Sequence, residues 1–180
     1  MEFPAVVNVA GFSQGEMAGY HLVVWREGGA ADAALFQATV SDTEVLDALE
    51  SLGATPGDAL DIDSWEDRND DSSWKPDQVV EGPALEILVR VAGGGELLTL
   101  AEILDDPAGL GFDMRFGGHR ANIPKWRSGC VACLYSCPGG KTGNACYTVR
   151  DFVKGTTRFR ARPGILPSDG SAVTLRLQLR

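Results

Sequence analysis

Residues 173–179 read Val-Thr-Leu-Arg-Leu-Gln-Leu, so apolar and polar side chains alternate along the whole stretch. Successive side chains of a strand point to opposite faces of a sheet, and this alternation therefore predicts a strand with one buried face. Residues 83–91 show the same period, with Leu85, Ile87 and Val89 on one face. Two such strands favour a sheet that packs one face on a core and exposes the other, which is typical of antiparallel sheets.

Four more segments are rich in β-branched and aromatic residues or alternate with period two, and we expect each to form a strand. They are residues 6–9, 20–25, 112–116 and 158–162. Residues 30–39 fit a short helix and a strand equally well. The chain is therefore expected to hold about six or seven strands, joined by short turns.

The clearest helix signal begins at Ser41. In the sequence Ser-Asp-Thr-Glu, the Ser41 hydroxyl can accept a hydrogen bond from the Glu44 amide while the Glu44 carboxylate reaches back, which is a capping box. Gly53 suits a left-handed C-terminal cap. The apolar residues in between fall on one helical face: Val45, Leu46, Leu49 and Leu52.

Two shorter segments also favour helix. Residues 99–102 form a second capping box, and residues 147–154 fit a helical turn with its apolar residues turned inward. Because strands outnumber helices, we expect an α+β fold. It would be β-rich, with a mostly antiparallel sheet, two or three short helices and a cysteine-rich loop.

The 180 residues are enough for one domain with a core of its own, and we expect a single domain over residues 1–180. The charge is divided: residues 1–113 carry −19 and residues 114–180 carry +10, which gives the net charge of −9. This balance, without a known nucleic-acid-binding motif, argues against a nucleic-acid partner.

Membrane and export signals are weak in the sequence as it stands. No apolar run approaches the ~20 residues of a membrane-spanning helix. The first residues, Met-Glu-Phe-Pro-Ala, lack the basic and apolar regions of a secretory signal. We therefore expect no membrane span, and the sequence leaves the compartment and the oligomeric state open.

The four cysteines lie within 17 residues, at Cys130, Cys133, Cys137 and Cys146, with the spacing C-x2-C-x3-C-x8-C. Structural cysteines scattered through a core would not cluster in this way. An iron–sulfur cluster needs converging thiolates on short loops, and the glycines of this segment permit tight backbone. The spacing nevertheless differs from the usual C-x2-C-x2-C-x3-C ferredoxin run.

Three other interpretations of the cysteines stay open. Four thiolates could close a tetrahedral zinc site, although zinc knuckles usually contain two C-x2-C pairs. One or two disulfides would be expected in an oxidising compartment. A thioredoxin-like pair of Cys130 and Cys133 lacks the βαβ pattern that normally surrounds it.

Cationic residues surround the cysteines in the sequence, and they favour thiolates and offset the charge of a cluster: Arg115, Arg120, Lys125, Arg127, Lys141 and Arg150. They could equally form a solvated face that pairs with the acidic part. His21 lies among apolar residues of a strand and is interpreted as structural. His119 is a candidate supporting group or alternative ligand.

The acidic stretch of residues 61–66 invites a calcium hypothesis. It fails the EF-hand test, because Trp65 occupies a ligand position and Glu66 stands where glycine is required. We interpret this stretch as a solvated acidic loop, with Trp65 and Trp74 fixing it to the body of the protein.

The chain resembles the YdjY-domain family in several segments: residues 20–24, 28–36, 40–41, 48–57, 113–118 and 167–177. The family is bacterial, its activity is not established, many members look exported or lipid-anchored, and some are labelled ferredoxin-type iron–sulfur proteins. The resemblance thus implies an iron–sulfur site and a place in the periplasm or cell envelope, with the cytoplasm as the alternative. Ala31-Asp32 stands where the family pattern has His-Glu, which puts any role of that pair in doubt here.

Together, these observations predict a protein that binds a [4Fe-4S]-type cluster through Cys130, Cys133, Cys137 and Cys146. Its role would be electron transfer or redox support, with a partner protein that offers an acidic surface to the basic part. The alternative is a non-enzymatic binding or structural module whose loop is held by disulfides or by a zinc ion on the four cysteines. An enzyme that uses His119 with a reactive cysteine is the third class.

Overall fold

A computed structural model describes residues 1–93, 95–106, 108–155 and 158–180. Its strands are β1 (Glu2–Val7), β2 (His21–Trp25), β3 (Ala34–Ala38), β4 (Ala84–Val91), β5 (Leu97–Thr99), β6 (Leu104–Asp105), β7 (Met114–Phe116), β8 (Cys130–Cys133), β9 (Thr142–Asn144), β10 (Arg160–Ala161) and β11 (Ala172–Leu179). Its helices are α1 (Val9–Phe12), α2 (Asp42–Ser51), α3 (Asp63–Glu66), α4 (Leu100–Ile103), α5 (Ile123–Trp126) and α6 (Val149–Val153), with 3-10 turns at Ala31–Ala33, Lys75–Asp77 and Arg120–Asn122.

Eight strands form a closed barrel in the order β11-β1-β3-β2-β8-β9-β7-β4, because β4 pairs with β11 and joins the two ends of the sheet. The two alternating segments, residues 83–91 and 173–179, thus hold the strands that close the barrel. They run antiparallel, with Val173 opposite Val91 and Leu179 opposite Leu85. β5 extends the sheet beyond β4.

The expected α+β fold on a mostly antiparallel sheet is wrong. The barrel is mixed, because β2 pairs with β3 and β8 pairs with β9 in parallel. Parallel neighbours need a connection that brings the chain back to the starting edge, and a 3-10 turn at Ala31–Ala33 lies in the first of these connections. The expectation of a β-rich chain with short helices is confirmed.

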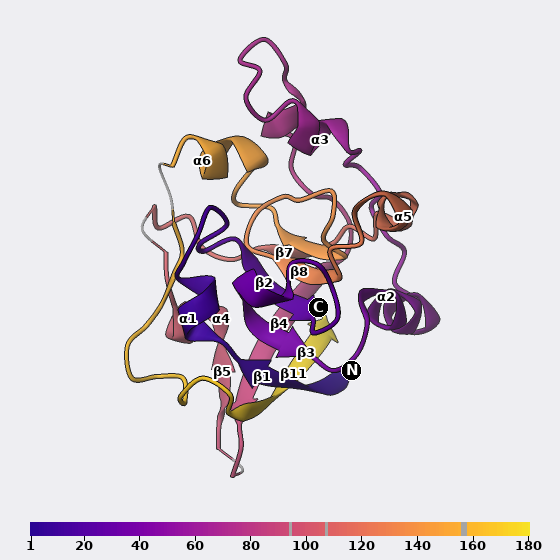
Figure 1. The fold of residues 1–180 in the computed structure, drawn as a ribbon. Helices are drawn as coiled ribbons and strands as arrows, with labels where there is room; N and C mark the ends of the chain where they lie inside the picture. Colours follow the sequence, from indigo (N-terminus) through magenta and orange to yellow (C-terminus); the bar gives the residue numbers. More distant parts are fainter. Residues whose placement is uncertain (94, 107, 156–157) are drawn as a thin grey trace.

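Helix α2 lies beside the barrel and is separated from the loop that carries α3 (Figure 1). Its capping box is formed as expected, since Glu44 N–H donates to Ser41 Oγ and Ser41 N–H donates to the Glu44 carboxylate. Three apolar residues of the predicted face are fully buried, whereas Leu52 lies past the helix end and is exposed. The second capping box, at Thr99 and Glu102, is also present.

The two ends of the chain meet. β1 pairs with β11, and the Met1 amino group donates a hydrogen bond to the Leu177 carbonyl oxygen at 2.8 Å. The core beneath these strands is built from fully buried side chains of distant segments, among them Phe36, Leu46 and Leu175. Among the helices that the structure describes, none has the length and apolar character that crossing a bilayer requires.

Candidate metal centre

The cysteine segment is a strand rather than a loop at its start. Cys130 and Cys133 lie at the two ends of β8, which pairs antiparallel with β2 and sets His21 opposite Cys133. In a regular strand, residues three apart point to opposite faces. The register between β2 and β8 is irregular, and Val131 has no paired residue in it. A bulge of this kind adds one residue to the strand and so reverses the alternation of the side chains that follow it. The thiols of Cys130 and Cys133 therefore point to the same face of the sheet.

Three side chains converge at this bulge. The Cys130 and Cys133 sulfurs are 2.6 Å apart, and His21 Nδ1 lies 3.6 Å from the first and 3.8 Å from the second. Their potential ligand atoms all lie within 4.8 Å of one another, and all three residues are buried. Donors on one tetrahedral ion at bonds of about 2.3 Å are about 3.8 Å apart, which the two nitrogen–sulfur distances match. The two sulfurs are closer than this, so they would move apart to bind one ion.

The electrostatics of the site favour a charged thiolate. Burial raises the pKa of the Cys130 thiol, but hydrogen bonds from Cys133 and His21 outweigh burial and lower this pKa to about 6. Burial lowers the pKa of His21, and its contact with Cys130 more than offsets this, so the net shift is upward. Burial and the neighbouring thiols raise the pKa of Cys133. These directions favour one negative charge that the coupled pair of Cys130 and Cys133 shares.

Cys137 adds a third buried thiol beside the group. Its interaction with Cys133 outweighs burial and lowers the pKa of Cys137 to about 7. The Gly139 N–H points at the Cys137 sulfur at 3.4 Å. Cys137 is nevertheless outside the group of ligand atoms that lie within 4.8 Å of one another.

Cys146 lies apart from the other three predicted ligands. It follows β9, is only partly buried, and has Asp113, Asp106 and Arg115 as charged neighbours; burial raises its pKa. The structure thus brings three of the four predicted cysteines together.

The two histidines exchange the roles that their sequence surroundings suggest. His21 faces the thiols, whereas both ring nitrogens of His119 are used by the backbone: Nδ1 lies 3.0 Å from the Gly140 oxygen, and Nε2 accepts from Leu60 N–H at 3.3 Å. Burial lowers the pKa of His119, in keeping with a neutral ring. No spacing rule could have found His21, since it reaches the cysteines only through strand pairing across more than 100 residues.

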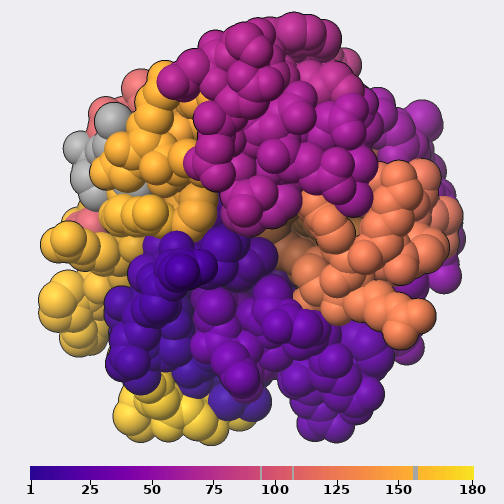
Figure 2. All heavy atoms as spheres, turned by 45° about the horizontal axis from the view of Figure 1, so that its top comes forward, coloured from indigo at the N-terminus to yellow at the C-terminus, as the bar shows by residue number. Residues whose placement is uncertain are grey.

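A cavity of about 190 Å³ lies beside the thiols. It is lined by Met17, Tyr20, His21, Ala30, Trp65, Trp126, Ser128, Cys130, Cys137 and Gly139. In the space-filling view, the segments that contribute these residues, coloured indigo to purple, magenta and orange, meet around a hollow (Figure 2). Trp65 lies in α3 rather than in a loop, and it packs edge to face with Tyr20 as expected. The same expectation is wrong for Trp74, which is 67% exposed.

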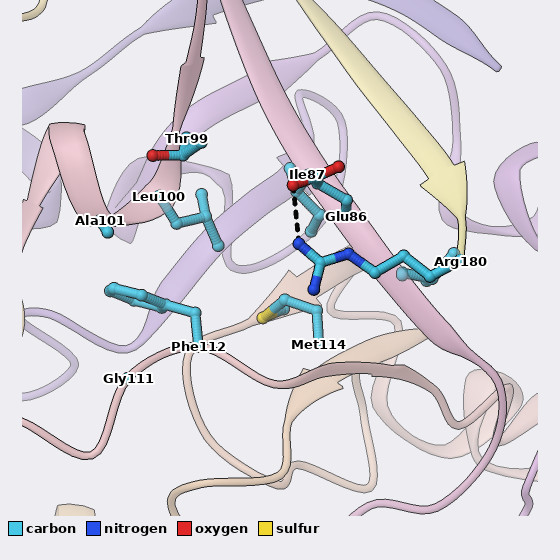
Figure 3. A pocket seen from close by; sticks show the side chains of 10 residues that line it. Glu86, Ile87, Thr99, Leu100, Ala101, Gly111, Phe112, Met114 and Arg180 are labelled. Carbon is cyan, nitrogen blue, oxygen red and sulfur yellow. Dashed lines mark hydrogen bonds and ion pairs between the residues drawn. The ribbon is translucent and has the colours of Figure 1, made fainter.

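A second cavity of about 300 Å³ lies between β4, β5 and α4 (Figure 3). Leu100, Phe112 and Met114 form an apolar floor there, and Glu86 pairs with Arg180 at 2.7 Å. Its lining residues include neither a cysteine nor a histidine. This cavity is therefore separate from the candidate metal centre.

The comparisons with known proteins agree with the resemblance noted above. A model of the YdjY domain matches residues 1–178. The chain is 29% identical over 160 residues to "Uncharacterized protein YdjY" of Escherichia coli (strain K12), an alignment that covers 88% of this chain and 67% of that protein. No solved structure matches the chain. The match along nearly the whole sequence shows that this chain belongs to the YdjY-domain family.

Proposed function

We propose that this protein binds a single thiophilic metal ion, zinc or iron, through His21, Cys130 and Cys133. The observation that carries the proposal is the convergence of one imidazole nitrogen and two sulfurs within 4.8 Å in a buried place. Imidazole and thiolate together suit first-row transition metals better than magnesium or calcium.

Charge supports the same conclusion. Two thiolates and a neutral imidazole around a divalent cation have no net charge, which lowers the cost of burying the site. Lys141, which is 1% exposed, lowers the pKa of Cys130 by its positive charge and so further favours the thiolate. The ion would thereby join β2 to β8 and stabilise the barrel.

An iron–sulfur cluster is the second candidate, and Cys137 is the observation that favours it. This third thiol lies beside Cys133 and lines the cavity with Cys130. A cluster there would use His21 or an external group as its fourth ligand, because Cys146 lies apart. Electron transfer to a partner with an acidic surface is the role that such a cluster would support.

The test is an elemental analysis of protein that is purified without oxygen and without added metal. We expect one equivalent of zinc or iron per chain and no acid-labile sulfide. Iron together with an equal amount of sulfide would replace the single ion by the cluster. A chain without any metal, whose thiols react only after reduction, would contradict both candidates and indicate a disulfide.

A further inference from the structure

We propose that the metal centre takes up a small aromatic ligand, which supplies the fourth donor atom, a nitrogen or a sulfur, and packs against Trp65 and Trp126 in the adjoining cavity. This inference rests on the proposed function, since it requires an ion at His21, Cys130 and Cys133. It states which class of ligand the metal site binds.

An ion held by His21, Cys130 and Cys133 has an open coordination position. Structural zinc sites close their tetrahedron with four protein ligands, whereas sites with three protein ligands leave the fourth position to an external group. The group here has three members, and the neighbouring Cys137 thiol lies outside it. His21 and Cys130 also line the cavity, so an ion held between them has the cavity next to it.

The walls of the cavity favour an aromatic ligand. Beyond the ligands, its walls are mostly apolar, with Met17, Ala30, Trp65 and Trp126 among them. The two indole rings have centroids 6.4 Å apart and are nearly perpendicular, at 80°. Such walls bind flat apolar rings and give little to a free inorganic anion. At about 190 Å³, the cavity lies below the 300–1,000 Å³ of typical drug-sized sites, which limits the ligand to about one or two rings.

Tyr20 also favours a ligand in this cavity. Its hydroxyl is fully buried and makes no hydrogen bond of good geometry in the described part of the chain, and the Cys137 thiol is the polar group that interacts with it. Buried hydroxyls without a partner are rare, because they lose their bonds to water without replacement. Tyr20 lines the cavity with its ring while its hydroxyl oxygen is enclosed, so a small shift of the ring would let a second polar atom of the ligand become the missing partner.

The walls are held in place before any ligand arrives. The Arg68 guanidinium lies 4.7 Å from the Trp65 ring centroid, and Trp65 also packs against Phe152. Trp126 lies on the backbone of Gly139, where a Cβ atom would come within 2.7 Å of the indole. A preformed cavity binds its ligand without a cost for ordering its walls.

The test uses protein loaded with cobalt(II) without oxygen. Absorption from thiolate-to-cobalt charge transfer reports that the ion is bound, and the visible ligand-field bands report its coordination. The probes are 4-phenylimidazole, which combines a nitrogen donor with a flat ring, and imidazole, which has the donor alone. We expect both to change the visible bands and 4-phenylimidazole to bind at least about tenfold more tightly, because its phenyl ring is buried.

Three variants sharpen this test. Trp126→Leu should remove most of the advantage of 4-phenylimidazole over imidazole, and Tyr20→Phe should weaken 4-phenylimidazole binding several-fold, each with the charge-transfer band retained. The matched control is Trp74→Leu, which changes an exposed tryptophan of the segment that carries Trp65 and should leave both affinities unchanged.

The outcomes separate the two proposals. Visible bands that respond to neither probe, in protein that shows charge transfer, would overturn the inference, because the coordination would then be closed from within. Equal affinities for the two probes would overturn it as well. If cobalt gives no charge-transfer band at all, the proposed metal site itself is wrong.

Discussion

Cys130 and Cys146 differ in burial and in neighbours, and they provide a matched pair of variants for the metal centre. Cys130 is 1% exposed and lies against His21 and Cys133, whereas Cys146 is partly exposed beside carboxylates. We expect Cys130→Ser to lower the affinity for zinc by at least about 100-fold, because removing groups that merely support a ligand already costs 10–100-fold. Competition with a chromophoric chelator measures this affinity.

The same measurement on Cys146→Ser should give the affinity of the parent protein. If Cys146→Ser loses the metal as completely as Cys130→Ser, all four cysteines act together and the three-residue site is wrong. Both variants replace sulfur by oxygen with little change in shape, so a difference between them reports the chemistry of the thiol.

His119 makes a prediction about pH. Burial lowers its pKa below the ordinary 6.5, so the folded protein favours the neutral ring that accepts from Leu60 N–H. The unfolded chain then binds a proton more readily, and this part of the stability is present above about pH 6.5 and is lost as the pH falls through the folded pKa. Urea unfolding of metal-free protein between pH 8 and pH 5 should show this loss.

In His119→Gln the loss over the same pH range should be smaller, because the titrating ring is gone. Comparing the two proteins cancels the titration of the thiol site, which both contain. Identical pH dependence in both would mean that His119 titrates alike in the folded and unfolded chain, against the bonds seen here.

At the scale of elements, the sequence predicts what depends on local chemistry. The alternation of residues 83–91 and 173–179 matches β4 and β11, and the capping boxes at Ser41 and Thr99 are formed. These signals come from neighbouring residues, whose side chains and backbone interact whatever the rest of the chain does.

Such local patterns do not predict which distant strands pair with one another. The ambiguous residues 30–39 become a 3-10 turn followed by β3, whose place between β1 and β2 is decided by the closure of the barrel. For the same reason the cysteines could be found as a cluster, whereas His21 and the separate position of Cys146 could not. Both depend on the bulged pairing of β2 with β8 and on the turn after β9.

The capping box of α2 gives a prediction at this scale. Ser41 Oγ accepts from Glu44 N–H at 3.1 Å, and replacing such an N-cap by alanine costs about 1 kcal/mol. We expect Ser41→Ala to lower the free energy of unfolding by about this amount in urea titrations. Ser51→Ala, at the other end of the helix, is the control and should change it by less than about 0.5 kcal/mol. An equal effect of both would mean that the cap is not formed in solution.

At the scale of the whole molecule, the acidic and basic parts of the chain meet. Arg120 pairs with Asp47 and Glu50 of α2, at 2.6 and 2.8 Å. Arg150, which is 5% exposed, holds residues 70–77 of the acidic part through Asp77 at 3.3 Å and through two backbone oxygens. Much of the basic charge that suggests a docking surface in the sequence is therefore engaged within the molecule.

The most deeply buried of these links joins Lys141, before β9, to Asp42, the first residue of α2. Lys141 Nζ lies 3.5 Å from the Asp42 carboxylate and donates to the Gly139 oxygen at 2.9 Å. Their side chains are 1% and 9% exposed, so removing either partner leaves a buried charge without compensation. Losses of this kind are about 3–5 kcal/mol.

We therefore expect Lys141→Met and Asp42→Asn each to lower the free energy of unfolding of the metal-free protein by about 3 kcal/mol. The double variant should lose clearly less than the sum of the two, because it buries no unpaired charge. Urea titrations of the four proteins give the coupling energy directly. Additive losses would mean that the two charges do not interact, and that the acidic and basic parts are held together by packing and by the exposed pairs alone.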